Sequence, residues 1–275
     1  MSTLTVAKKD YHDAIRSREL WVLMALFVLF LPVVALYDVT SGTSVDDGLP
    51  IGTLFSMVFV MTVLAPVTAL LVSIKSIVRE RRLGTIKFLL AFPYTRGEVY
   101  VGKFLGRLAV FATAVLVGYV PAFLILFFGI SDFAVGPFVG MLVVILFFGL
   151  IFVVVGYAAS ALTTSETVAS VAGFALFFLV YSWQSVFSLL NWWLGLVDGN
   201  AETFIHRFGL TAVSEDIVNA VASIWDSDID SASVAVSNGG DVPFYLQHWF
   251  AFVVLGVWIG LPLALGYWRF RRAEL

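Results

Sequence analysis

Six long apolar stretches divide this sequence and limit the folds that it can adopt. A helix needs about 20 mostly apolar residues to cross the hydrocarbon core of a membrane, and none of the six contains Asp, Glu, Lys or Arg. The stretches are Leu20–Tyr37, Ile51–Ile74, Leu108–Ile130, Pro137–Leu162, Val168–Leu190 and Gln247–Trp268. Only 13% of the residues are charged, about half the share in a soluble protein. We therefore predict an all-α membrane protein with six transmembrane helices.

The basic residues between these stretches predict which side of the membrane each end of the chain faces. Lysine and arginine are enriched in cytoplasmic segments. With the N-terminus inside, 15 of the 16 basic residues are cytoplasmic and Arg207 alone lies outside. We therefore expect a multi-pass protein of the plasma membrane with both termini in the cytoplasm. Its parts are an amphipathic N-terminal helix (1–19), a transmembrane domain (20–268) with an extracytoplasmic segment (191–246), and a cytoplasmic tail (269–275).

The cytoplasmic loop 75–107 carries helix signals that a simple connection between two spans would not need. Gly84 can end the helix that descends from the second span, because glycine tolerates the left-handed position after a helix. Thr85 can then cap a short helix that continues to Leu90, and Pro93 stops it. Such a short, stiff helix could pass a push from a soluble partner to the spans. The alternative is a basic loop that only fixes the topology.

The third span is predicted to begin well before its apolar part. Thr95 and Glu98 have the spacing of a capping box, in which each residue bonds the backbone of the other. Tyr94 and Val99 occupy the two positions of a hydrophobic staple around the same cap. The third helix therefore starts near Thr95, in the cytoplasm, and runs on into the membrane.

The segment from Glu80 to Lys103 resembles a signature of ABC-2-type permeases, the membrane-spanning subunits of one class of ABC transporter. The matching residues are Glu80, Gly84, Thr85, Leu89, Leu90, Pro93, Arg96, Gly102 and Lys103. The N-terminal segment 8–18 is similar to the interfacial helix of that family. A copper or nitrous-oxide-reductase maturation permease is one candidate subfamily.

The resemblance implies a fold feature, a partner and a set of site residues. In that family the loop forms the coupling helix, which docks into a cleft of the ATPase subunit. The implied partners are a separate ABC ATPase subunit, the lipid bilayer, and either a second copy of this chain or a related permease. The residues implied in ATPase coupling are Glu80, Gly84, Thr85, Leu89, Leu90, Pro93 and Arg96.

Simpler roles stay open for several residues of the loop. Gly84 and Pro93 can serve as helix punctuation alone. Lys103 can extend to the membrane interface. Glu80 and Arg96 can pair with charges on the ATPase or with each other. Three further side chains can contact anionic lipid; they are Arg79, Arg81 and Arg82.

The sequence predicts no nucleotide, cofactor, metal or nucleic-acid site in this chain. Gly97, Gly102 and Lys103 have the spacing of a phosphate-binding loop, but Phe104 follows where Ser or Thr is required. ATP would therefore bind to a separate subunit, and this chain would not itself be an enzyme. The chain has no cysteine, and its three histidines lie outside the span cores. They are His12, His206 and His248.

Polar side chains inside the spans are few, and the fifth span holds the densest group. Ser182, Gln184 and Ser185 can either hydrogen-bond between helices or line a substrate path. We predict the permease subunit of an ATP-driven ABC transporter, which couples ATPase motion to movement of a substrate. The alternative is a membrane anchor or scaffold that recruits a soluble partner through the same basic loop.

Overall fold

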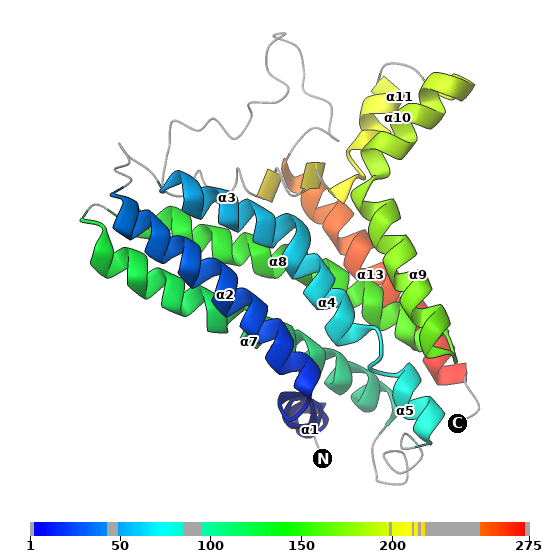
Figure 1. Ribbon diagram of the computed structural model, residues 1–275. Helices are drawn as coiled ribbons and strands as arrows, with labels where there is room; N and C mark the ends of the chain where they lie inside the picture. Colours follow the sequence, from blue (N-terminus) through cyan, green and yellow to red (C-terminus); the bar gives the residue numbers. More distant parts are fainter. Residues whose placement is uncertain are drawn as a thin grey trace.

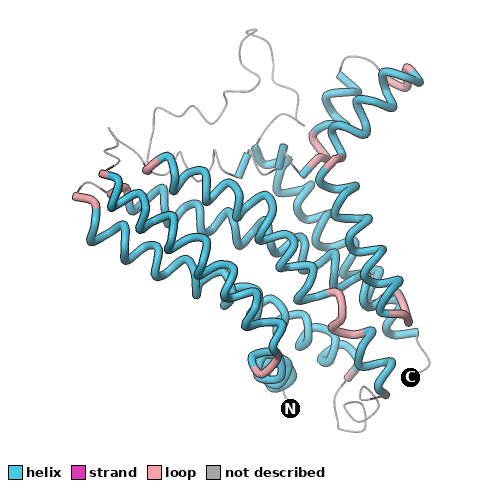
Figure 2. Tube along the Cα trace, in the orientation of Figure 1, coloured by secondary structure: helices cyan, strands magenta, loops and turns pink. Residues whose placement is uncertain are grey.

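Long helices lie side by side and run obliquely across Figure 1, which presents a computed structural model of the chain. The structure describes residues 3–42, 49–84, 95–131, 133–197, 200–210, 212–213, 216–217 and 248–272. Within these residues the ordered elements are helices joined by short loops, and no strand is present (Figure 2). The predicted all-α class is confirmed.

Five long helices and the three consecutive segments of the second span form the body of the bundle, and the other short helices extend it at both ends. The long helices are α2 (Arg18–Ser41), α7 (Arg96–Gly129), α8 (Val135–Leu162), α9 (Glu166–Tyr181) and α13 (His248–Arg272). The shorter segments are α1 (Thr3–Ile15), α3 (Ile51–Phe59), the π-helix η1 (Val60–Leu64), α4 (Ala65–Ser73), α5 (Val78–Leu83), α10 (Trp183–Leu194) and α11 (Asn200–His206).

Five helical stretches of the described chain can each cross a membrane by length and composition, and a bent helix pair brings the number to six. The bent pair is α9 with α10, which meet at an angle of 69°. We predicted one span over Val168–Leu190, and the structure shows that it is divided by this bend. At 1.5 Å per residue, the 16 residues of α9 cover about 24 Å, which is less than a full hydrocarbon core.

The bend between α9 and α10 has a local cause at Ser182. This residue has φ −93° and ψ 11°, outside the helical range, and its hydroxyl donates to the Phe178 carbonyl. The indole N–H of Trp183 then donates to the Ile205 carbonyl at 3.2 Å, which holds the start of α10 against the end of α11. Hydropathy cannot detect such a bend, because both helices are apolar.

The second span is also irregular, although it stays one continuous path from α3 to α4. Its centre is the π-helix η1, directly before Pro66. Proline has no N–H to donate to the preceding turn, and its ring clashes with the carbonyl four residues earlier. A wider turn relieves that clash, which explains why the π-helix lies at this point.

The core of the bundle forms around α8. This helix packs against α4, α7, α9 and α13, and every residue from Ile151 to Ala161 is buried. A helix that is apolar on all sides is stable only when neighbours surround it. Beside it, α2 and α7 approach closely at Gly118, where a Cβ atom would lie 2.6 Å from the Phe27 carbonyl.

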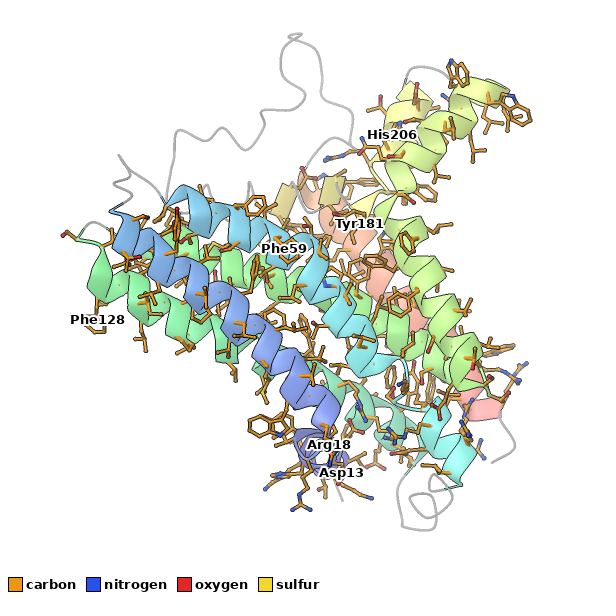
Figure 3. The ribbon with its side chains drawn as sticks, viewed as in Figure 1. Asp13, Arg18, Phe59, Phe128, Tyr181 and His206 are labelled. Carbon is orange, nitrogen blue, oxygen red and sulfur yellow. The ribbon has the colours of Figure 1, made fainter. Side chains whose placement is uncertain are left out.

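The two ends of the bundle differ in character. The N-terminus, α5 and the C-terminus lie at one end, whereas α10 and α11 lie at the other (Figure 1). Asp13 and Arg18 mark the first end, and Phe128 projects into the surroundings far from it (Figure 3). Both termini therefore share one side of the bundle, in agreement with an even number of spans. That this side faces the cytoplasm stays a prediction.

Candidate functional site

The short helix α5 follows the second span after a sharp turn. α4 ends at Ser73, and residues 74–77 form the turn, so the predicted continuous helix is interrupted there. α5 then ends at Gly84, which has φ 70° and donates its N–H to the Arg81 carbonyl. Glycine adopts this left-handed conformation without steric cost. The predicted role of Gly84 as a helix terminator is confirmed.

The start of α5 is capped by a side chain from a distant helix. The hydroxyl oxygen of Ser160, near the end of α8, accepts hydrogen bonds from the N–H groups of Ile77 and Val78 at 2.9 and 3.0 Å. Ser160 is fully buried. The first N–H groups of a helix have no partner within the helix, so this serine replaces a local cap. No local pattern predicts a cap from a residue 83 positions away.

Two arginines of α5 extend these contacts to further helices. Arg81 donates to the carbonyls of Ala161 at 2.9 Å and Thr163 at 3.4 Å, and its guanidinium lies 5.4 Å from the centre of the Phe270 ring. Arg82 forms a more exposed ion pair with Glu166 at 3.4 Å. α5 is therefore attached to the ends of α8, α9 and α13.

Four charged residues, of which Asp10 and Lys103 are buried and Glu80 and Arg107 are partly exposed, connect α5 with α1 and α7. The Lys103 ammonium lies 2.9 Å from Oδ1 of Asp10 and 2.7 Å from Oε1 of Glu80. The Arg107 guanidinium contacts both carboxylate oxygens of Asp10, at 2.9 and 3.1 Å. We call Asp10, Glu80, Lys103 and Arg107 the Lys103 cluster. Its members belong to three elements that are far apart in the sequence.

The Lys103 cluster balances its charges around a Lys103–Asp10 pair that is almost completely shielded from water. The Lys103 side chain is only 2% exposed, so it does not extend to the membrane interface, and that simpler interpretation is wrong. An unpaired buried charge costs several kcal/mol, and two cations facing two anions avoid that cost. The cluster therefore holds its three elements in one arrangement.

The N-terminal helix reaches the cluster because α7 has no side chain in its path. Gly102 and Gly106 are four residues apart and share one face of α7. A Cβ atom at Gly102 would lie 2.7 Å from the Thr3 carbonyl, and one at Gly106 would lie 2.8 Å from Asp10 Oδ2. The two glycines thus let α1 pack directly on α7 and bring Asp10 within reach of Lys103.

The start of α7 agrees with the prediction from its sequence. The Glu98 N–H donates to the Thr95 hydroxyl, and the Thr95 N–H donates to the Glu98 carboxylate, so the capping box is complete. Arg96 donates to the Arg271 carbonyl at 2.6 Å, and the Tyr100 hydroxyl donates to the Leu263 carbonyl at 3.1 Å. The first turns of α7 are therefore bound to α13.

The remaining predicted coupling residues lie outside the described residues. They are Thr85, Leu89, Leu90 and Pro93, together with the staple residue Tyr94. The helix that precedes this segment, α5, lies at the same end of the bundle as both termini (Figure 1). Of the predicted residues, Glu80 joins the Lys103 cluster and Arg96 contacts the C-terminal helix.

The predicted path residues lie at the bend of the fifth span. Gln184 and Ser185 are exposed on α10, and the Ser182 hydroxyl bonds within its own helix. Next to them, a cavity of about 750 Å³ opens between α8, α9 and α13. Its lining includes Val155, Leu176, Trp183, Phe187, Trp258 and Pro262, and none of the three path residues. The role of these three as a path lining stays a prediction.

The described residues contain no group of three or more His, Cys, Asp or Glu side chains that could hold a metal ion. The acidic members of the Lys103 cluster instead face cations of the protein itself. The charged residues at this end are therefore suited to holding helices together through ion pairs.

Comparison with known proteins gives a consistent result over the full length of the chain. The sequence profile of the family described as ABC-2 family transporter protein matches residues 4–275. A probable ABC transporter permease protein NosY from Pseudomonas aeruginosa is 28% identical, with 98% of each chain covered. The protein with the same description from Stutzerimonas stutzeri is 29% identical, with 97% of each chain covered.

Proposed function

This chain belongs to the ABC-2 family of transporter proteins and is a membrane permease subunit of an ABC transporter, and we propose that α5 couples an ATPase subunit to its spans. The observation that carries the proposal is the number of helices that α5 holds at once. Through the Lys103 cluster it binds α1 and α7, and through Ser160, Arg81 and Arg82 it binds α8, α9 and α13. A displacement of α5 would therefore displace several spans together.

The proposed contact with the ATPase subunit lies between α5 and α7. Residues 85–94 connect two anchored elements: α5, which Glu80 and Arg81 hold, and the start of α7, which Arg96 holds to α13. We expect this connection to contact the ATPase through Thr85, Leu89, Leu90 and Pro93, with Gly84 and Arg96 at its edges. Glu80 would act inside the permease, because its carboxylate is bonded to Lys103.

The proposed assembly follows from the same premise. ATP would bind to a separate ATPase subunit, and two permease chains would form the path across the plasma membrane. The end of the bundle with α5 and both termini would face the cytoplasm, where the ATPase subunit binds ATP. The positive-inside distribution of 15 among 16 basic residues supports this orientation.

Co-purification with the ATPase subunit tests the contact. A Leu89→Asp/Leu90→Asp variant should lose the ATPase, because charged side chains oppose an apolar interface. Leu189→Asp is the matched control: Leu189 is an exposed leucine on α10, at the other end of the bundle. This control should retain the ATPase. If the double variant retains the ATPase as well, the proposed docking segment is wrong.

Two neighbouring arginines test the transmission of the motion. Arg81→Gln removes charged hydrogen bonds to the end of α8, which contribute about 1.5–3 kcal/mol each. The stimulation of ATP turnover by substrate in the intact complex should therefore fall about tenfold. Arg82→Gln removes a largely exposed ion pair and should have little effect. If the ATPase stays bound and both variants transport normally, α5 only recruits the partner, as in the scaffold alternative.

A further inference from the structure

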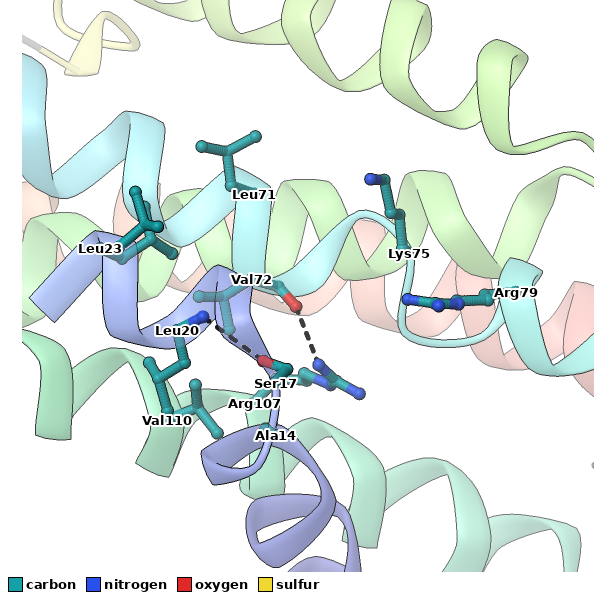
Figure 4. Close-up of a pocket in the computed structure, with 11 residues that line it drawn as sticks. Ala14, Ser17, Leu20, Leu23, Leu71, Val72, Lys75, Arg79, Arg107 and Val110 are labelled. Atoms are coloured by element: carbon teal, nitrogen blue, oxygen red, sulfur yellow. Dashed lines mark hydrogen bonds between the residues drawn. The ribbon is translucent and has the colours of Figure 1, made fainter.

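A second cavity, of about 350 Å³, lies at the charged end of the bundle (Figure 4). It is formed by the start of α2, the end of α4, the turn before α5, and α7. Its volume is in the range of roughly 300–1,000 Å³ that is usual for small-molecule sites. The lining residues are Ala14, Ser17, Leu20, Val22, Leu23, Leu71, Val72, Lys75, Arg79, Arg107 and Val110. The lining thus has an apolar part and a basic part.

The basic part of this cavity carries three cationic side chains and, among its lining residues, no acidic one. Lys75 lines the cavity from the turn that joins α4 to α5, and Arg79 lines it from the first turn of α5 (Figure 4). Arg107 enters from α7, where it also holds Asp10 and donates to the Val72 carbonyl at 3.3 Å. Although Arg107 is already paired with Asp10, Lys75 and Arg79 bring further positive charge to the same cavity, and a bound anion would be attracted to it.

The apolar part of the cavity continues into the outer surface of the spans. Leu20 and Leu23 line it from α2, Leu71 from α4 and Val110 from α7. Leu71 is exposed, and Val22 is 61% exposed at the mouth. In a membrane protein such a surface faces acyl chains. The cavity therefore leads from a positively charged floor to a surface that lipid covers.

An aromatic residue places the mouth of the cavity at the edge of the membrane. Trp21, beside the lining residues Leu20 and Val22, is 62% exposed, and its indole N–H donates to the Ile15 carbonyl. At the same end of the bundle, Arg272 lies over the exposed Trp268 ring at 4.2 Å. Tryptophan is enriched at the membrane–water boundary, where phospholipid headgroups lie.

We propose that this cavity binds an anionic glycerophospholipid. Its phosphodiester would lie between Lys75 and Arg79 beside Arg107, and one acyl chain would follow Leu23 and Leu71 toward the bilayer. Basic pockets between membrane helices on the cytoplasmic side take anionic headgroups in this way. Arg107 belongs both to the cavity and to the Lys103 cluster, so the bound lipid would touch the connection that holds α5. The binding itself does not depend on an ATPase.

Native mass spectrometry of the full-length chain in neutral detergent tests the site. Titration with phosphatidylglycerol and with phosphatidylcholine should give about tenfold tighter binding of the anionic lipid. A Lys75→Gln/Arg79→Gln variant should lose that preference. Lys8→Gln/Lys9→Gln is the matched control, because it removes two exposed cations from α1, at the same end of the bundle and outside the cavity. It should keep the preference.

Several outcomes would overturn the proposal. An unchanged preference in the Lys75→Gln/Arg79→Gln variant would remove the cavity as the site. Equal losses in this variant and in the Lys8→Gln/Lys9→Gln control would leave only general surface charge. Full displacement of the lipid by inorganic phosphate would indicate a site for a free anion. If the double variant does not fold, as judged by its unfolding temperature without lipid, Arg79→Gln alone takes its place, because Arg79 is exposed.

Discussion

The two ends of the helix bundle are held together by different kinds of contact. At the end with α5, charged and polar groups join this helix to α1, α7, α8, α9 and α13 through the Lys103 cluster, Ser160, Arg81 and Arg82. At the opposite end an aromatic cluster, in which the ring centroids of Phe204, Phe208 and Phe250 lie 5.2–5.9 Å apart, packs beside hydrogen bonds from the Trp183 and Trp258 indoles to backbone carbonyls. One buried ion pair, Arg207 with Asp216 at 2.7 Å, accompanies them.

This difference indicates how the ends can behave. Hydrogen bonds and ion pairs require particular distances and angles, so the end with α5 favours one relative placement of its helices. Apolar contacts are not directional, and the opposite end combines them with a bend of 69° and a large apolar cavity. We expect the first end to move as a unit and the second to rearrange, as a transport cycle requires.

The largest effect is expected from the centre of the Lys103 cluster. Lys103→Met removes one cation and leaves the buried Asp10 and the partly exposed Glu80 with Arg107 alone. Breaking a buried ion pair in this way costs about 3–5 kcal/mol, so the unfolding temperature in detergent should fall strongly. Lys9→Met, on the exposed side of α1, should leave it nearly unchanged. Equal unfolding temperatures for both variants would mean that the cluster does not hold the end together.

A smaller effect is expected where α5 meets α8. Ser160→Ala leaves the N–H groups of Ile77 and Val78 without their acceptor, at about 1–3 kcal/mol for each buried group. Hydrogen exchange of the two amides should become faster, and the unfolding temperature should fall. Thr40→Ala is the control, because the exposed Thr40 hydroxyl bonds only carbonyls of its own helix. Unchanged exchange in Ser160→Ala would show that this cap does not restrain α5.

The smallest effect is expected at the opposite end. Trp183→Phe keeps an aromatic ring but removes the hydrogen bond to the Ile205 carbonyl, which contributes about 1 kcal/mol. The unfolding temperature should fall less than in Ser160→Ala. Trp192→Phe is the control, because Trp192 is strongly exposed on α10. A Trp183→Phe effect as large as that of Lys103→Met would remove the contrast between the two ends.

Local patterns predicted the parts of the site whose partners are close in the sequence. The capping box of Thr95 and Glu98 spans three residues, and a Gly84 terminator needs only the backbone conformation of one residue. Apolar length likewise predicted the spans, except for the bend at Ser182. Two apolar helices that meet at an angle have the same hydropathy as one straight helix, so the sequence carries no signal for it.

The order of the spans, the helix boundaries at Gly84 and Thr95 and the separation of basic from apolar segments were determined by the sequence itself. They depend on the solvent that each residue type prefers and on hydrogen bonds within one turn. Only the tertiary structure placed Asp10 against Lys103, 93 residues away, and the Ser160 hydroxyl against the Ile77 N–H, 83 residues away. The packing of helices determines such partners. Gly102 and Gly106 allow α1 to lie directly against α7, and the end of the central helix α8 lies beside α5.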